Sequence, residues 1–195
     1  MHRFSLYAIL TLLCLLLPAR PAGAQRTAEG TAFAGIAPHV SVRTAPSWGF
    51  GLEAGRYTGG GLWKIGVRAV DWNQRASVVP DGTSAAFDSA LLSAGFVRLV
   101  RLWGSYGRRA SVYAGGGVFL GACVRGALRP LPPETAGDFP AAEFAYGVEP
   151  VLELELFPFR TVAAVLSVQS PFTFGASLPS DFWRVCASLG IRVNI

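Results

Sequence analysis

The sequence predicts an all-β protein, an eight-stranded antiparallel up-and-down transmembrane β-barrel of the outer-membrane type. First, 51% of the 195 residues are hydrophobic and only 15% are charged, against about 25% charged residues in a typical soluble domain. Second, no apolar run after the first 24 residues reaches the length of a membrane-spanning helix. Third, apolar and polar residues alternate in eight separate segments, which is the signature of strands with one face in lipid.

Residues 1–24 have the pattern of a secretory signal peptide. A basic start and an apolar run from Phe4 to Leu17 precede the small residues Ala22-Gly23-Ala24, which are typical of a cleavage site. The run is shorter than the roughly 20 residues of a spanning helix, which argues against an uncleaved anchor. We therefore expect residues 25–195 to form a single barrel domain in the bacterial outer membrane after export.

The C-terminal segment shows the alternation most clearly, because every second residue from Trp183 to Ile195 is apolar. A helix would scatter these residues around its circumference, whereas a strand places them on one face. Seven upstream segments repeat the pattern. The eight expected strands span residues 33–43, 48–57, 61–70, 87–103, 112–124, 146–156, 161–170 and 183–195.

Two of these segments carry conflicting signals. Residues 87–103 also fit a helical stripe of apolar residues, and a helix stays open as an alternative there. We assign a strand because the neighbouring segments are strands. Pro150 lies inside the segment 146–156 and cannot donate a ladder hydrogen bond, so we expect a bulge or a local break at that point.

The links between the expected strands alternate in length. Links after the second, fourth and sixth strands are short, and those after the third, fifth and seventh are long, while the first link, 44–47, is short and departs from the rule. Outer-membrane barrels show this asymmetry, with tight periplasmic turns and longer exterior loops. The short links are 58–60, 104–109 and 157–160, and the long ones are 73–86, 126–142 and 171–181.

The alternation turns four acidic and four basic side chains toward the barrel interior. Eight strands leave an interior that side chains just fill, and a closed sheet satisfies its own backbone in lipid. Because both signs are present, we expect a lumenal network of ion pairs and not an open channel. The expected network comprises Glu53, Lys64, Arg68, Glu149, Glu153, Glu155, Arg184 and Arg192.

A water-soluble barrel or sandwich is the alternative to a membrane barrel. In that fold the same charged side chains would face solvent and the large apolar side chains would form the core. The signal peptide, the low charge and the tryptophans near strand ends favour the membrane barrel, because aromatic girdles mark the membrane interfaces. These tryptophans are Trp48, Trp63, Trp103 and Trp183.

The sequence predicts no catalytic, metal or cofactor site. His39 is the one histidine after the signal peptide, and nothing marks Ser41 or another serine as an activated nucleophile beside it. The glycine triplets 59–61 and 115–117 lack the lysine and hydroxyl of a phosphate-binding loop. Cys123 and Cys186 fall on strands that lie apart around the barrel, so we expect two separate buried thiols.

Three blocks of the sequence resemble the conjugal-transfer TraO family of conjugative transposons. Residues 56–66, RYTGGGLWKIG, resemble that family's "RYT…G..W.FG" region. Residues 144–155, FAYGVEPVLELE, resemble its "FLYGG…LE.E" segment, and residues 188–195, SLGIRVNI, are similar to its "GVGIKFIIN" end. The expected long links between residues 73 and 87 and between residues 125 and 142 show no match.

The resemblance implies a non-enzymatic outer-membrane component of a conjugative DNA-transfer apparatus related to type IV secretion, in an anchoring or scaffolding role. Its partners would be outer-membrane lipid and other proteins of the apparatus, and no catalytic residue is carried over. Residues 25–195 hold 15 basic and 12 acidic residues, an excess too small to favour direct nucleic-acid contact, and we expect no small-molecule substrate. The alternatives are a small barrel for adhesion or envelope integrity and a lipid-modifying outer-membrane enzyme that uses His39.

Overall fold

The computed structural model describes residues 29–42, 47–71, 74–77, 84–87, 89–104, 109–125, 142–175 and 183–195. The expected signal peptide, residues 1–24, lies outside the described residues, as do parts of the expected long links and most of the link 44–47. In the described part of the chain, no helix has the length and apolar character needed to cross a membrane.

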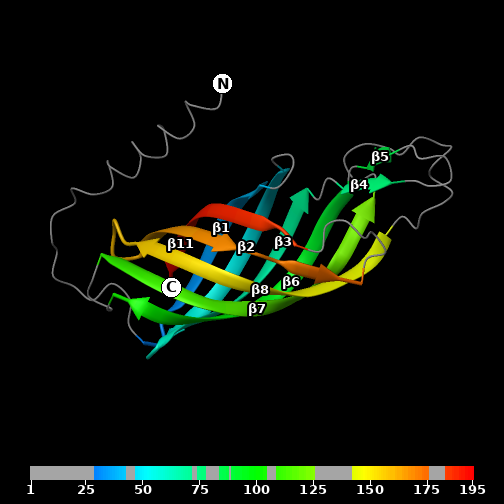
Figure 1. Ribbon diagram of the computed structural model, residues 1–195. Coiled ribbons are helices and arrows are strands. Elements are labelled where there is room, and N and C mark those ends of the chain that lie inside the picture. Colours follow the sequence, from blue (N-terminus) through cyan, green and yellow to red (C-terminus); the bar gives the residue numbers. More distant parts are fainter. Residues whose placement is uncertain are drawn as a thin grey trace, which may run out of the picture.

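Eight antiparallel strands close into a barrel in which each strand pairs with its successor along the chain (Figure 1). Pairing of the last strand with the first completes the circle. The predicted eight-stranded up-and-down fold is confirmed, and the ambiguous segment 87–103 contains a strand. The barrel strands are β1 (Ala32–Val42), β2 (Ser47–Thr58), β3 (Gly61–Asp71), β6 (Ser89–Trp103), β7 (Ala110–Arg125), β8 (Ala142–Leu156), β9 (Val162–Gln169) and β11 (Val185–Asn194).

Three short strands lie in segments that the sequence predicts to be links. The strands β4 (Gln74–Ser77) and β5 (Ser84–Phe87) pair with each other, and β10 (Phe172–Phe174) pairs with β8. In Figure 1 the β4–β5 hairpin lies at the end of the barrel far from the C-terminus. We call this the loop end. The opposite end, where β2 meets β3 and β8 meets β9, is the turn end.

The expected disturbance at Pro150 is a local break on one side of β8. Pairing with β9 stops at Val151 and Gln169 and resumes between Val148 and Phe172 of β10 in the same register. The carbonyl of Pro150 still accepts a hydrogen bond from the backbone N–H of Ser170 at 3.1 Å. The proline therefore interrupts the ladder without shifting it, and β10 continues the path of β9 around the barrel.

The register defines the stagger of the barrel. The stagger can be followed from Val162 on β9 by moving to the paired residue on each neighbouring strand in turn. The path runs through β11, β1, β2, β3, β6, β7 and β8 and returns to Phe172, ten residues further along the chain. A stagger of this size around eight strands requires strands that tilt by roughly 35–45° from the barrel axis. Residues that pair across the sheet therefore climb toward the loop end as the sheet winds round.

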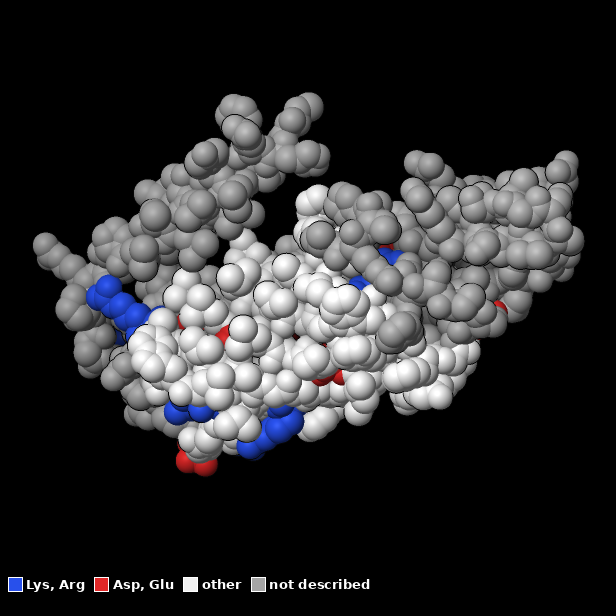
Figure 2. Space-filling model, viewed as in Figure 1, with Lys and Arg blue, Asp and Glu red and all other residues white. Residues whose placement is uncertain are grey.

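Side chains alternate between a polar interior and an apolar outer wall. Arg192 and Glu153 are fully buried, whereas their apolar neighbours Ile191 and Leu152 are 55% and 51% exposed. Figure 2 shows that the visible wall is mostly free of charged side chains, with the larger blue patches near its margins and a few red atoms visible between white ones. The buried charges of the described residues lie inside the barrel and most large apolar side chains lie outside, which is the reverse of the soluble alternative.

The expected tryptophans divide between the two ends of the outer wall. Trp63 and Trp103 lie at the turn-end termini of β3 and β6, whereas Trp48 and Trp183 lie at the loop-end side of β2 and β11. Trp48, Trp103 and Trp183 are exposed. Two levels of exposed aromatic side chains with apolar residues between them are the pattern of a barrel that crosses a bilayer.

Candidate functional site

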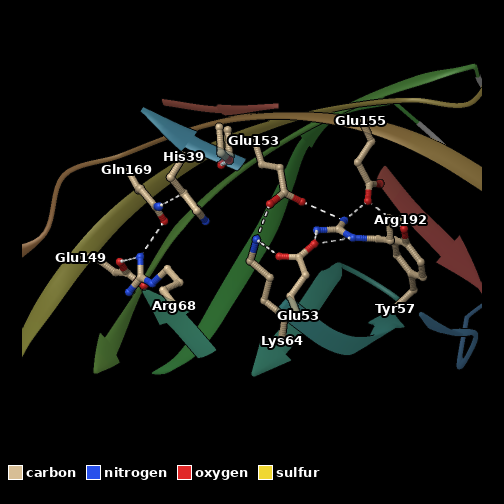
Figure 3. Close-up of polar contacts among 12 residues, drawn as sticks. His39, Glu53, Tyr57, Lys64, Arg68, Glu149, Glu153, Glu155, Gln169 and Arg192 are labelled. Carbon is tan, nitrogen blue, oxygen red and sulfur yellow. Dashed lines mark hydrogen bonds and ion pairs between the residues drawn. The ribbon is translucent and has the colours of Figure 1, made fainter. Parts of the chain in front are cut away.

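The structure brings seven of the eight expected lumenal charges into two connected groups inside the barrel (Figure 3). They come from the β2–β3 hairpin, from β8 and from β11, three parts of the chain that are distant in the sequence. Each of these residues occupies an inward position of its strand, so the alternation of the sequence determines that its side chain points into the lumen. The closed sheet then places them face to face across the lumen.

Arg192 of β11 is the centre of the first group. Its guanidinium lies 2.5 Å from Glu53 Oε1 and 2.9 Å from Glu153 Oε1, and it also contacts Glu155. Its Cζ lies 4.2 Å from the centre of the Phe33 ring, within the range of a cation–π contact. The planar fork of arginine can serve several carboxylates at once, which a lysine in the same place could not do.

Lys64 of β3 joins two of the same carboxylates from the other side. Its Nζ donates to Glu53 Oε2 at 2.8 Å and to Glu153 Oε2 at 2.6 Å. Tyr57 Oη donates to Glu155 Oε1 at 2.7 Å. Two cations and a phenol therefore hold three buried carboxylates together, and each carboxylate that has left water has a charged or hydrogen-bonding partner.

The second group lies nearer the loop end and contains a histidine. Arg68 Nη1 lies 2.7 Å from Glu149 Oε2 and donates to Gln169 Oε1 at 3.0 Å. The Gln169 amide in turn lies 3.0 Å from His39 Nδ1, and the Arg68 guanidinium stacks 5.7 Å from the Phe119 ring centre. Nδ1 of the catalytic histidine in a Ser-His-acid triad faces a carboxylate, whereas this histidine meets a neutral amide.

Arg184, the eighth expected residue, is buried at the loop-end side of β11 and is not part of the two groups described above. Its backbone carbonyl accepts a hydrogen bond from Ser170 Oγ at 3.0 Å, and its backbone N–H donates to the carbonyl of Pro171. These contacts join the start of β11 to the end of β9, where the ladder was interrupted.

Buried apolar clusters lie on both sides of the charged groups in the lumen. Toward the turn end, the rings of Phe33 and Tyr57 contact each other at a tilt, with centres 5.1 Å apart, and pack with Leu62, Leu99 and Tyr113. Toward the loop end, Leu91, Phe119 and Ala145 form a second buried cluster. Between them a cavity of about 50 Å³ touches His39, Glu53, Lys64, Arg68 and Glu149, which is room for a few water molecules. The described lumen is thus filled.

Two inward glycines make room for the rings in these clusters. A Cβ at Gly55 or at Gly147 would lie 2.5 Å from the Cζ atom of Phe33 or Phe119 respectively. In both cases the aromatic ring occupies the space of the missing side chain, which lets a narrow barrel hold a phenylalanine. Cys123 and Cys186 are buried and do not form a disulfide, as expected for two separate thiols.

Sequence reasoning missed the neutral members of this interior. Tyr57, Gln169 and the pair Ser167 and Ser188, whose hydroxyls lie 2.6 Å apart, take part in the interior hydrogen bonds. All of them occupy inward positions of expected strands, so the alternation contained the signal. A neutral side chain at such a position gives no indication of its partner, whereas a charge in an apolar wall demands one.

Comparison with known proteins supports the fold. No protein-family model matches the chain, and no curated protein matches its sequence. Neisserial surface protein A has a similar structure, with a TM-score of 0.52 and 13% identity over 85% of this chain and 96% of that one. The chain therefore has the eight-stranded barrel fold of outer-membrane proteins.

Two further solved structures are similar at lower scores. The N-terminal β-barrel domain of Pseudomonas aeruginosa OprF has a TM-score of 0.47 and 14% identity, covering 86% of this chain and all of that domain. The attachment invasion locus protein Ail of Yersinia pestis, in complex with a heparin analogue, has a TM-score of 0.44 and 15% identity, again over 86% and 100% of the two chains.

Proposed function

We propose that the protein is a non-enzymatic barrel of the bacterial outer membrane that anchors or scaffolds a conjugative DNA-transfer apparatus. The observation that carries the proposal is the combination of an apolar outer wall with a lumen filled by ion pairs. Such a barrel is held by lipid and offers its two ends to other proteins. Its partners are outer-membrane lipid and other components of the apparatus.

The filled lumen argues against transport and against catalysis inside the barrel. Buried apolar clusters lie on both sides of the charged groups, and Arg192 and Lys64 are paired with carboxylates. His39 contacts an amide, so the lipid-modifying alternative lacks the acid that would orient this base. The anchoring role needs neither a pore nor a nucleophile.

The conjugative part of the proposal is supported by the resemblance to the TraO family and by where its blocks lie. The block 56–66 forms the β2–β3 hairpin, the block 144–155 lies in β8, and the block 188–195 covers most of β11. Together these blocks carry five of the charges that meet in the lumen. The five are Lys64, Glu149, Glu153, Glu155 and Arg192.

Adhesion or envelope integrity is the second candidate function. The fold similarity to Neisserial surface protein A favours it, because that protein is a surface protein of the same barrel fold. The β4–β5 hairpin at the loop end would lie outside the cell, where an adhesive contact forms. In the conjugative role the exposed Phe159 and Arg160 of the β8–β9 turn would instead face periplasmic partners.

A mating assay tests the proposal. We expect deletion of the gene in the donor to lower the transfer frequency at least tenfold, and the intact gene to restore it. A Phe159→Ser/Arg160→Ser variant should insert as a folded barrel, shown by its faster unboiled gel mobility, yet restore transfer poorly. An unchanged transfer frequency in the deletion strain, with loss of surface attachment, would overturn the conjugative role in favour of adhesion.

A further inference from the structure

Two arginines on the outer wall flank a tryptophan near the turn end. The sheet register pairs Arg56 of β2 with Trp63 of β3, and Trp63 with Arg98 of β6. Both arginines are exposed. Because neighbouring strands lie about 4.8 Å apart, the two arginines leave the sheet about 10 Å from each other, one on each side of the indole.

Both guanidinium groups are directed toward the turn end. Arg98 Nη1 donates to Thr58 Oγ1 at 3.0 Å, and Arg56 Nε donates to the carbonyl of Gly30 at 2.6 Å. Thr58 and Gly30 lie at the turn-end limits of β2 and β1. Long cationic side chains reach in this way from an apolar wall to a membrane interface. Each bond uses one of the five N–H donors of a guanidinium, which leaves donors for a further partner.

An apolar hollow lies on the loop-end side of this row, on the same three strands and on β7. Ala54, Ile65 and Phe96 are the next outward residues on β2, β3 and β6, and they line the hollow together with Ala94 and Leu120. The hollow measures about 670 Å³. It exists because alanines stand beside larger side chains. Two cations with the spacing of a lipid headgroup therefore lie next to an apolar groove with the size of an acyl chain, on the same face of the barrel.

We propose that this face binds one phospholipid of the leaflet at the turn end. Its phosphate lies between Arg56 and Arg98 beside Trp63, and one acyl chain fills the hollow. Arginine is suited to phosphate because its planar fork donates paired, charge-assisted hydrogen bonds, and an indole is suited to the same interfacial depth. A second copy of the chain would present the same positive pair, so charge complementarity favours the lipid.

Native mass spectrometry of the full exported barrel in a nonionic detergent, with dioleoyl phosphatidylglycerol added, tests the site. We expect the wild-type barrel to retain one lipid molecule. Arg56→Gln/Arg98→Gln should weaken retention at least tenfold. Ala94→Phe, which fills the hollow and leaves both arginines in place, should weaken it as well. Arg160→Gln, at an exposed arginine of the β8–β9 turn, is the matched control and should bind like the wild type.

The inference rests on the proposed membrane placement, so unboiled gel mobility of each variant is measured first. A wild-type chain without the mobility of a folded barrel would overturn the membrane placement and the site together. With folded barrels, unchanged retention in both site variants, or an equal loss in the Arg160→Gln control, would overturn the lipid site alone. A dimer that forms on this face and disappears with Ala94→Phe would also overturn it, in favour of a second copy.

Discussion

Replacing Arg192 by methionine removes the cation that three buried carboxylates share. Glu153 and Glu155 are fully buried and Glu53 is largely so, which means that bulk water cannot take over most of the lost contacts. Removing one partner of a buried ion pair costs about 3–5 kcal/mol, and the cation–π contact with Phe33 contributes about 1 kcal/mol. We expect Arg192→Met to lower the free energy of unfolding by about 4–6 kcal/mol.

The assay is a urea titration of the barrel in lipid vesicles, with the folded fraction determined from unboiled gel mobility. The matched control, Arg160→Met, removes an exposed arginine and should stay within about 0.5 kcal/mol of the wild type. Adding Glu155→Gln to Arg192→Met should recover part of the loss, because one uncompensated charge is then neutral. An Arg192→Met barrel whose free energy of unfolding stays within about 1 kcal/mol of the wild type would show that the three carboxylates do not depend on Arg192.

Three other perturbations probe the wall, the packing and the thiols. Val118→Arg, on the outer wall midway along β7, should lower the free energy of unfolding by about 2–4 kcal/mol in the same titration. Trp183→Arg, near the loop end, should lower it by at most about 1 kcal/mol. Equal costs would show that the two positions do not lie at different depths in the membrane. Gly147→Ala should cost about 1–3 kcal/mol, because its Cβ would lie 2.0 Å from the backbone carbonyl oxygen of Phe172 and 2.5 Å from the Phe119 ring. A neutral substitution would show that both groups can move away. Cys123 and Cys186 should react with a water-soluble maleimide only after unfolding, and a mobility shift reversed by dithiothreitol would instead reveal a disulfide.

The sequence was sufficient for the strands and for the direction of each side chain, because a period of two determines which face a residue occupies. It was insufficient for the pairing between charges. Glu53 and Arg192 are 139 positions apart, and they meet because both pair with Gly35 of β1, the strand that lies between β2 and β11 once the barrel closes. Alternation does not define that pairing, since slipping two residues along a ladder leaves every face unchanged.

The short strands escaped prediction for a related reason. β4, β5 and β10 span three or four residues each, too few to establish a period. β10 also follows the interruption opposite Pro150, so its pairing with β8 depends on a register inherited from β9. The neutral pair of Gln169 and His39 lacked the charge that singled out Arg68 and Glu149.

In this barrel the apolar side chains form the outer wall, where lipid would contact them, and the polar side chains fill the interior. Nitroxide labels introduced one at a time at Leu166, Ser167 and Val168 of β9, in a Cys123→Ala/Cys186→Ala barrel in vesicles, test this arrangement most directly. Leu166 and Val168 point outward and Ser167 inward. Collisional relaxation by oxygen, which concentrates in lipid, should be strong at 166 and 168 and weak at 167. Strong relaxation by a water-soluble nickel complex at 166 and 168 would show that these side chains face water and not lipid.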